Sequence, residues 1–190
     1  YDDVVRVPLA ICGPGIEPSN EPVTEFVTHT LDLGPTLLEL TGVAVGEGTR
    51  AAFHGRSLLP LLTGGTPAGW PEYVVSSYNG QQFGLYNQRM IRTAEWKYVW
   101  NPTDVDELYD LVHDPAELTN RIADAPHGVL AELRRKLYEE LVRGEDGLVR
   151  NDWLRRQLLE GRKLLRSGAI PAFGATAASG AAAARAARGG

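Results

Sequence analysis

Four short stretches between residues 73 and 111 constrain the fold of this chain most strongly. Each is rich in aromatic and β-branched residues, the types that favour strands. They read YVVSSY at 73–78, YNQRMIRT at 86–93, WKYVW at 96–100 and ELYDL at 107–111. Turn-forming pairs such as Asn79-Gly80 and Asn101-Pro102 separate them. Short strands joined by such turns predict a small antiparallel meander.

One amphipathic segment follows the predicted strands. Asp124 and Pro126 provide a helix start. Four leucines then recur at helical spacing, and they are Leu130, Leu133, Leu137 and Leu141. Such a stripe is the expected cover for one face of a sheet. Because Trp96, Tyr98 and Trp100 alternate along one strand, they are predicted to pack beneath this helix.

The first 65 residues have a different character. The run VVRVPLAI at 4–11, bounded by glycine and proline, suits a strand buried on both faces of a parallel sheet. In THTLDLGPTLLELTGV, Asp32 is predicted to cap a helix with Pro35 in its first turn and a stop at Gly42. A second short helical or turn segment is expected in HGRSLLPLLTGG. A buried parallel strand needs neighbours, so we interpret the chain as starting within a larger α/β domain.

These patterns predict four regions. Residues 1–65 are the C-terminal end of the large α/β domain, and residues 66–145 form a small α+β subdomain with a short antiparallel sheet and a helix. Residues 146–166 are a helical extension. Residues 167–190 contain mostly Ala, Gly and Arg, so we predict a disordered tail.

The composition excludes several classes of partner. The chain has 190 residues, 43% of them hydrophobic, and a net charge of −5. This balance supports a folded core and gives no global attraction to nucleic acid. No apolar run approaches the roughly 20 residues that span a membrane. Neither nucleic acid nor a membrane is therefore an expected partner, while the cellular compartment stays unknown.

The order of four longer motifs resembles the C-terminal part of the type I sulfatases. It is also similar to their relatives, the phosphonate monoester hydrolases and phosphodiesterases of the alkaline phosphatase superfamily. The motifs are YDDVVRVPLAICGPG, THTLDLGPTLLELTGV, FHGRSLLPLLTGG and RMIRTAEWKYVWNPTDVDELYDLVHDPAELTNRIAD. The resemblance covers residues 1–145. It implies an incomplete alkaline-phosphatase-like α/β fold followed by the small subdomain.

The resemblance implies a parent enzyme that hydrolyses a small-molecule or carbohydrate sulfate ester. Its family uses a divalent metal, expected to be Ca²⁺, and a formylglycine made from the Cys of a CxPxR motif. Cys12 begins a similar stretch, but Ile16 stands where the family has Arg. We therefore interpret Cys12 as a small buried residue at a strand end.

The family's nucleophile and metal ligands are expected upstream of Tyr1, so we assign no catalytic residue and no metal ligand to this chain. Asp2 and Asp3 form a candidate metal pair, but they match the acidic residues that commonly precede RVPL in the family. The isolated chain is expected to be inactive.

Two other functions stay open. The parent enzyme could instead hydrolyse phosphonate or phosphate esters, as other members of the superfamily do. Alternatively, the chain could be a non-catalytic interaction module that uses its sheet edge and C-terminal helices. The same helices are a possible site of homo-oligomerisation.

The stretch at 78–92, YNGQQFGLYNQRMIR, is the predicted contact with substrate. Gln82 and Tyr86 offer neutral hydrogen-bonding groups, and Arg89 offers a guanidinium suited to anionic oxygens. Period-two alternation prevents Arg89 and Arg92 from facing one cleft together, and Arg89 is preferred because it lies closer to the loop. The alternative is an ordinary hairpin whose arginines face solvent or pair with Asp and Glu of the same subdomain.

Overall fold

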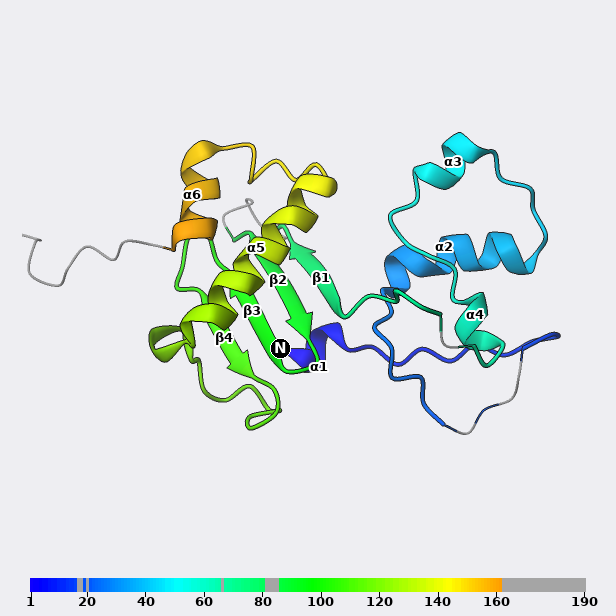
Figure 1. Cartoon of the computed structure of the whole chain (residues 1–190), viewed down its shortest axis with the longest axis horizontal. Helices are drawn as coiled ribbons and strands as arrows, with labels where there is room; N and C mark the ends of the chain where they lie inside the picture. The colour runs from blue at the N-terminus through cyan, green and yellow to red at the C-terminus, as the bar shows by residue number, and fades with distance from the viewer. Residues whose placement is uncertain (17–18, 20, 66, 81–85, 162–190) are drawn as a thin grey trace, which may run out of the picture. The chain divides into compact units, whose positions relative to one another are not determined.

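The computed structural model describes residues 1–16, 19, 21–65, 67–80 and 86–161 (Figure 1). Residues Tyr1–Leu159 form one compact unit. The predicted tail and Gln82 lie outside the described residues, and the predicted division at residue 65 stays a prediction. Among the described helices, none is long and apolar enough to cross a membrane.

A four-stranded antiparallel sheet lies within this unit. Its strands are β1 (Tyr73–Tyr78), β2 (Gln88–Thr93), β3 (Trp96–Trp100) and β4 (Glu107–Asp110). They lie in the order β1-β2-β3-β4, so the predicted meander is confirmed. Arg92 of β2 lies opposite Val74 on one side and Lys97 on the other. This register fixes which side chains share a face.

One face of the sheet packs against helix α5 (His127–Arg143), as Figure 1 shows. The shared core includes Ile91, Tyr98, Trp100, Leu108, Leu133, Leu137 and Leu141. Trp96 packs against the same core, so the predicted packing of the alternating aromatic residues beneath the helix is confirmed. A 3₁₀ turn, η1 (Ile122–Asp124), precedes α5.

The chain after α5 returns to the same core. The end of α5 has paired closing bonds, in which Asp146 N donates to Leu141 O (2.8 Å) and Glu145 N donates to Val142 O (3.1 Å). Helix α6 (Asp152–Glu160) then adds Leu158, which is fully buried. Helix α6 lies within the predicted helical extension at 146–166, and residues 147–151 form turns and a bend before it. The bounds of the extension stay a prediction.

The predicted strand at 4–11 is wrong. Residues Asp2–Val5 form a single helical turn, α1, and residues 6–13 have no regular secondary structure. Val7 and Leu9 are 49% and 44% exposed. A strand needs backbone partners for its N–H and C=O groups, and no described segment pairs with these residues. Cys12 is consequently exposed, and its predicted burial is wrong as well.

The predicted helix around Asp32 is present as α2 (His29–Leu40), but it begins earlier than expected. Asp32 lies inside its first turns, where Oδ2 accepts a hydrogen bond from Thr28 N (2.7 Å). The carboxylate thus caps the helix by reaching back to Thr28, and it also accepts from Arg56 N (2.9 Å). The predicted stop is confirmed, because Gly42 has φ +66° directly after the helix.

Pro35 lies within α2 and cannot donate to the carbonyl of Leu31. The backbone of Gly55 approaches that carbonyl closely, since a Cβ on Gly55 would lie 2.1 Å from Leu31 O. Only glycine fits at this position. Two short helices flank this contact in sequence, α3 (Glu47–Ala51), which the sequence did not predict, and α4 (Leu59–Leu62), which matches the second short helical segment.

Candidate functional site

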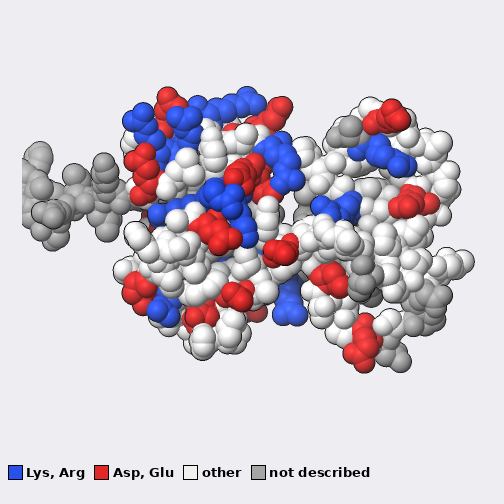
Figure 2. All heavy atoms as spheres, in the orientation of Figure 1, with Lys and Arg blue, Asp and Glu red and all other residues white. Residues whose placement is uncertain are grey.

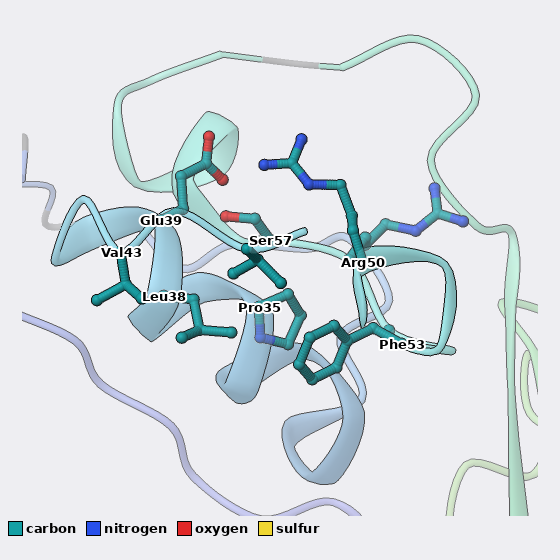
Figure 3. A pocket seen from close by; sticks show the side chains of 10 residues that line it. Pro35, Leu38, Glu39, Val43, Arg50, Phe53 and Ser57 are labelled. Carbon is teal, nitrogen blue, oxygen red and sulfur yellow. The ribbon is translucent and has the colours of Figure 1, made fainter. Parts of the chain in front are cut away.

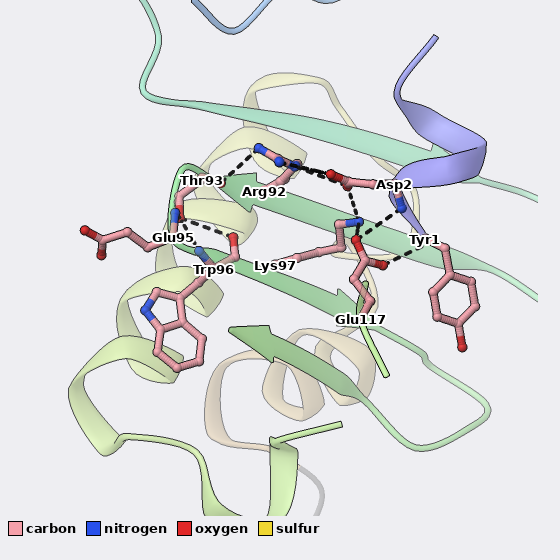
Figure 4. Close-up of polar contacts among 8 residues, drawn as sticks. All are labelled: Tyr1, Asp2, Arg92, Thr93, Glu95, Trp96, Lys97 and Glu117. Atoms are coloured by element: carbon pink, nitrogen blue, oxygen red, sulfur yellow. Dashed lines mark hydrogen bonds and ion pairs between the residues drawn. The ribbon is translucent and has the colours of Figure 1, made fainter. Parts of the chain in front are cut away.

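The face of the sheet turned away from α5 carries a cluster of charged side chains (Figure 4). Arg92 of β2 and Lys97 of β3 lie opposite each other in the register. Asp2 of α1 and Glu117, from the loop after β4, bring carboxylates onto these two cations. We call Asp2, Arg92, Lys97 and Glu117 the charged cluster. It joins three segments that are far apart in the sequence.

Lys97 is the buried centre of the charged cluster. Its Nζ donates to Asp2 Oδ1 and to Glu117 Oε1. Only 1% of the Lys97 side chain and 1% of the Glu117 side chain are exposed. A buried ammonium is tolerated only when carboxylates compensate the loss of its hydration. The two carboxylates therefore let a charged residue occupy a central strand.

Arg92 holds Asp2 with the fork geometry that arginine prefers for carboxylates. Its Nε lies 3.2 and 3.1 Å from the two carboxylate oxygens, and Nη2 lies 3.0 Å from Oδ2. Although partial burial opposes ionisation of Asp2, hydrogen bonds from Arg92 and Lys97 lower its pKa from 3.8 to about 2. Asp2 is thus a carboxylate at neutral pH, fully engaged by cations of the sheet.

Glu117 holds the start of α1 as well as Lys97. Asp2 N donates to Glu117 Oε1 (3.1 Å), so this carboxylate caps a helical turn from another segment. Glu117 has φ +56°, a left-handed conformation that is uncommon for residues other than glycine. Its backbone N donates to Asp114 O (3.0 Å), so Glu117 adopts this conformation within a hydrogen-bonded turn.

A second set of contacts leads from the charged cluster toward α2. The guanidinium of Arg92 lies 5.7 Å from the centre of the Phe26 ring. Phe26 O accepts a hydrogen bond from Trp70 Nε1 (2.8 Å), and the guanidinium of Arg56 lies 5.4 Å from the Trp70 ring. Cation–π stacking and one hydrogen bond therefore connect β2 with the segments that flank α2 and α4.

A pocket of about 220 Å³ lies beside α2, and Figure 3 shows the side chains that line it. Apolar side chains, among them Pro35, Leu38 and Phe53, form one part of its wall. Glu39 and Arg50 are the charged groups that reach it among the labelled side chains. Both side chains are exposed to solvent, so the pocket does not provide the dry, preorganised environment of a catalytic centre.

Charges of both signs are interspersed on the face drawn in Figure 2. Along α5, Glu132 pairs with Lys136 and Arg135 pairs with Glu139, both at a spacing of four residues. Pairs of this kind stabilise an exposed helix slightly. This face therefore carries no single-sign field that would steer a charged ligand.

The predicted substrate contacts lie in different environments. Arg89 is 5% exposed, and its Nε lies 2.6 Å from Asp146 Oδ2. Its Nη1 donates to Tyr78 O (3.1 Å) and Gln88 O (2.8 Å). The Arg89 guanidinium is therefore bonded to groups of the same chain, as in the alternative interpretation of this stretch as an ordinary hairpin. Tyr86 is 63% exposed, and Gln82 is outside the described residues. Substrate binding by these residues stays a prediction.

The described residues do not fit a metal ion. No group of three or more His, Cys, Asp or Glu side chains in this part of the chain is placed to hold one. Asp2 is bonded to Arg92 and Lys97, which leaves its carboxylate unsuited to a cation. His113 Nδ1 lies 2.9 Å from Asp110 Oδ2 on the surface, as an isolated pair.

Sequence reasoning did not find the charged cluster, although one signal pointed to it. In WKYVW, alternation places the aromatic residues on the core face and Lys97 on the other face of a central strand. A lysine at such a position needs an acidic partner. Its partners are Asp2, 95 positions away, and Glu117, 20 positions away. Local sequence patterns do not encode contacts over such separations.

With this arrangement established, comparisons with known proteins define the class to which the chain belongs. The fold of a small antiparallel sheet with covering helices is that of the C-terminal region of sulfatases. Residues 1–145 match the family described as N-sulphoglucosamine sulphohydrolase, C-terminal, and the chain belongs to this family. The resemblance to sulfatases and the predicted fold class are thereby confirmed.

Several individual proteins are similar to this chain. It is 36% identical over 150 residues to the Delta 4,5-hexuronate-2-O-sulfatase of Bacteroides thetaiotaomicron, a match that covers 77% of the chain and 30% of that enzyme. It is 32% identical over 176 residues to the choline-sulfatase of Rhizobium meliloti, covering 89% of the chain and 32% of that enzyme. The solved structure of a 2-O GAG sulfatase superposes with a TM-score of 0.62 and 36% identity, covering 70% and 29% of the two chains. The chain spans less than a third of the length of these proteins.

Proposed function

We propose that this chain is the C-terminal part of a sulfuric ester hydrolase, and that the complete enzyme cleaves a sulfate ester of a carbohydrate. The similarity to a hexuronate-2-O-sulfatase over 150 residues is the observation that carries the proposal. The similarity to a choline-sulfatase keeps a small-molecule sulfate ester as the competing substrate class.

We propose that one contribution of this chain to such an enzyme is structural. The charged cluster holds α1 against the sheet, and α1 leads directly into the extended residues 6–13. We propose that the nucleophile, a formylglycine, and a divalent cation such as Ca²⁺ are supplied by other parts of the complete enzyme. Because the described residues do not fit a metal, we assign this chain no step in that chemistry.

We further propose that the stretch at 78–92 lies at the wall of the substrate cleft in the complete enzyme. Tyr86 is largely exposed and can offer its hydroxyl to a ligand. Replacing Tyr86 with Ala in the complete enzyme should raise KM with little change in melting temperature. An unchanged KM would remove Tyr86 from the proposed cleft wall.

The substrate class is tested by measuring sulfate released by the complete enzyme. The panel pairs a 2-O-sulfated unsaturated hexuronate disaccharide with choline sulfate at equal concentrations. We expect kcat/KM for the disaccharide to exceed that for choline sulfate by at least about tenfold. Choline sulfate lacks the sugar groups, so it would lose the specific polar contacts that the site makes with them. Faster turnover of choline sulfate would assign the enzyme to the competing class, and no sulfate release from either would overturn the proposal.

A further inference from the structure

Arg92 contacts two separate stretches of the N-terminal region. Its guanidinium is bonded to Asp2 on one side and lies over the ring of Phe26 on the other. We propose that Arg92 is a double anchor, which fastens residues 1–5 and residues 26–28 to strand β2. This inference does not depend on the proposed hydrolase activity, because it concerns contacts within this chain.

The first stretch needs an anchor because α1 is too short to be stable alone. It has four residues, and its internal bonds include Val4 N to Tyr1 O (3.0 Å) and Arg6 N to Asp2 O (2.7 Å). A single helical turn is unfavourable in water without tertiary contacts. Asp2 makes polar contacts to Arg92, Lys97 and Glu117. Tyr1 adds a weaker contact, with its terminal ammonium 3.8 Å from Glu117 Oε2.

The second stretch leads into α2. Phe26 lies beneath Arg92, and two residues later Thr28 accepts the first bonds of the helix from Leu31 N (2.9 Å) and Asp32 N (2.8 Å). An anchored Phe26 would therefore restrain the segment that leads into the first turn of α2. A cation over a ring at 5.7 Å contributes favourable energy that an uncharged side chain does not supply.

The two contacts share one guanidinium, so they can be separated by substitution. Asp2→Asn removes the carboxylate and keeps Phe26. Phe26→Leu keeps an apolar side chain but removes the ring, and it leaves Asp2 in place. Arg92→Met removes both contacts together. Asp3→Asn is the matched control, because it makes the same charge change as Asp2→Asn at an exposed neighbouring residue.

Amide hydrogen exchange of the 190-residue chain reads out each stretch separately. In Asp2→Asn, exchange of the Arg6 amide should accelerate by at least about tenfold, with the Leu31 and Asp32 amides unchanged. Phe26→Leu should give the reverse pattern. Arg92→Met should accelerate exchange in both stretches, and Asp3→Asn in neither. The amides of α5 serve as the internal reference for global unfolding.

The pattern of exchange decides the proposal. If Arg92→Met accelerates only one stretch or neither, Arg92 is no double anchor. If Arg92→Met also accelerates amide exchange in α5, the variant has lost the fold. The two contacts of Arg92 are then tested by Asp2→Asn and Phe26→Leu alone, because both substitutions lie outside the sheet. Identical exchange of the Arg6 amide in Asp2→Asn and Asp3→Asn would show that the contact with Asp2 does not anchor the first stretch. Unchanged exchange of the Leu31 and Asp32 amides in Phe26→Leu would show that the contact with Phe26 does not anchor the second.

Discussion

The ammonium of Lys97 lies between the carboxylates of Asp2 and Glu117, with 1% of the lysine side chain exposed. The three residues come from α1, from β3 and from the loop after β4. A buried cation of this kind is stable only while its partners remain. The stability of the sheet and the position of the N-terminal segment therefore depend on the same side chain.

Replacing Lys97 with Met should destabilise the chain strongly. The substitution keeps an unbranched side chain but leaves the Glu117 carboxylate buried without its cation. We expect the free energy of unfolding to fall by about 3–5 kcal/mol, measured by urea denaturation. The matched control is Lys136→Met on α5, where losing the pair with the exposed Glu132 and the contact with the Tyr73 ring should have a much smaller effect. Equal losses in the two variants would contradict a central role for Lys97.

The charged cluster should make stability depend on pH in the acid range. The pKa of Asp2 is 3.8 in the absence of its partners and about 2 in the folded chain. As the pH falls, the unfolded chain therefore takes up the proton first, and folding loses free energy. This contribution is complete above about pH 4 and is lost as the pH falls through 2. We expect it to amount to about 1–2 kcal/mol, since part of the carboxylate is screened by water.

The measurement is the difference in unfolding free energy between the parent chain and Asp2→Asn at several pH values. The difference should be constant above pH 4 and shrink toward zero near pH 2. A difference that persists unchanged at the lowest pH would show that Asp2 stabilises the chain by something other than its charge.

The predicted sheet and its covering helix were correct because their signals are local. Aromatic and β-branched residues are concentrated in β1 and β3, the aromatic residues of β3 alternate, and turn-forming residues lie between the strands. The error at 4–11 has a different origin. Its composition suits a strand, but a strand forms only where another backbone accepts its hydrogen bonds. The composition of residues 4–11 indicates how readily they are buried, but it does not indicate whether a partner strand lies beside them.

The candidate site was harder to predict than the fold. Arg89 and Arg92 were both recognised as guanidinium groups on alternating faces, and that alternation is observed, since Arg89 meets Asp146 whereas Arg92 meets Asp2. The identity of each acidic partner was not predictable. Asp146 is placed by the end of α5 and Asp2 by α1, so both pairings exist only once the tertiary structure has formed.

Glu145 offers a stabilising substitution at the end of α5. It has φ +54° in the closing motif of the helix, and its side chain is 83% exposed. Its contact with Arg150, at 3.4 Å, is a surface pair of little energy. Glu145→Gly should relieve the left-handed strain and raise the unfolding free energy by about 0.5–1 kcal/mol. Glu139→Gly, within the same helix, should instead destabilise by about 1 kcal/mol.

Arg89→Ala distinguishes a structural role from substrate recognition. The pair with Asp146 is largely buried, with 6% and 13% of the two side chains exposed. Its loss should lower the unfolding free energy by about 2–4 kcal/mol, with kcat/KM of the complete enzyme unchanged at a temperature where the variant stays folded. Altered kinetics with an unchanged melting temperature would restore Arg89 to the substrate cleft.

The comparison of two ester substrates tests the central claim most directly. The complete enzyme and the 190-residue chain are assayed in parallel with an aryl sulfate and with the corresponding aryl phosphonate monoester. We predict that kcat/KM of the complete enzyme for the sulfate exceeds that for the phosphonate by at least about tenfold, and that the chain alone shows no turnover above the buffer rate. Preference for the phosphonate, or turnover of the sulfate by the isolated chain, would contradict the assignment of this chain as a non-catalytic C-terminal part of a sulfatase.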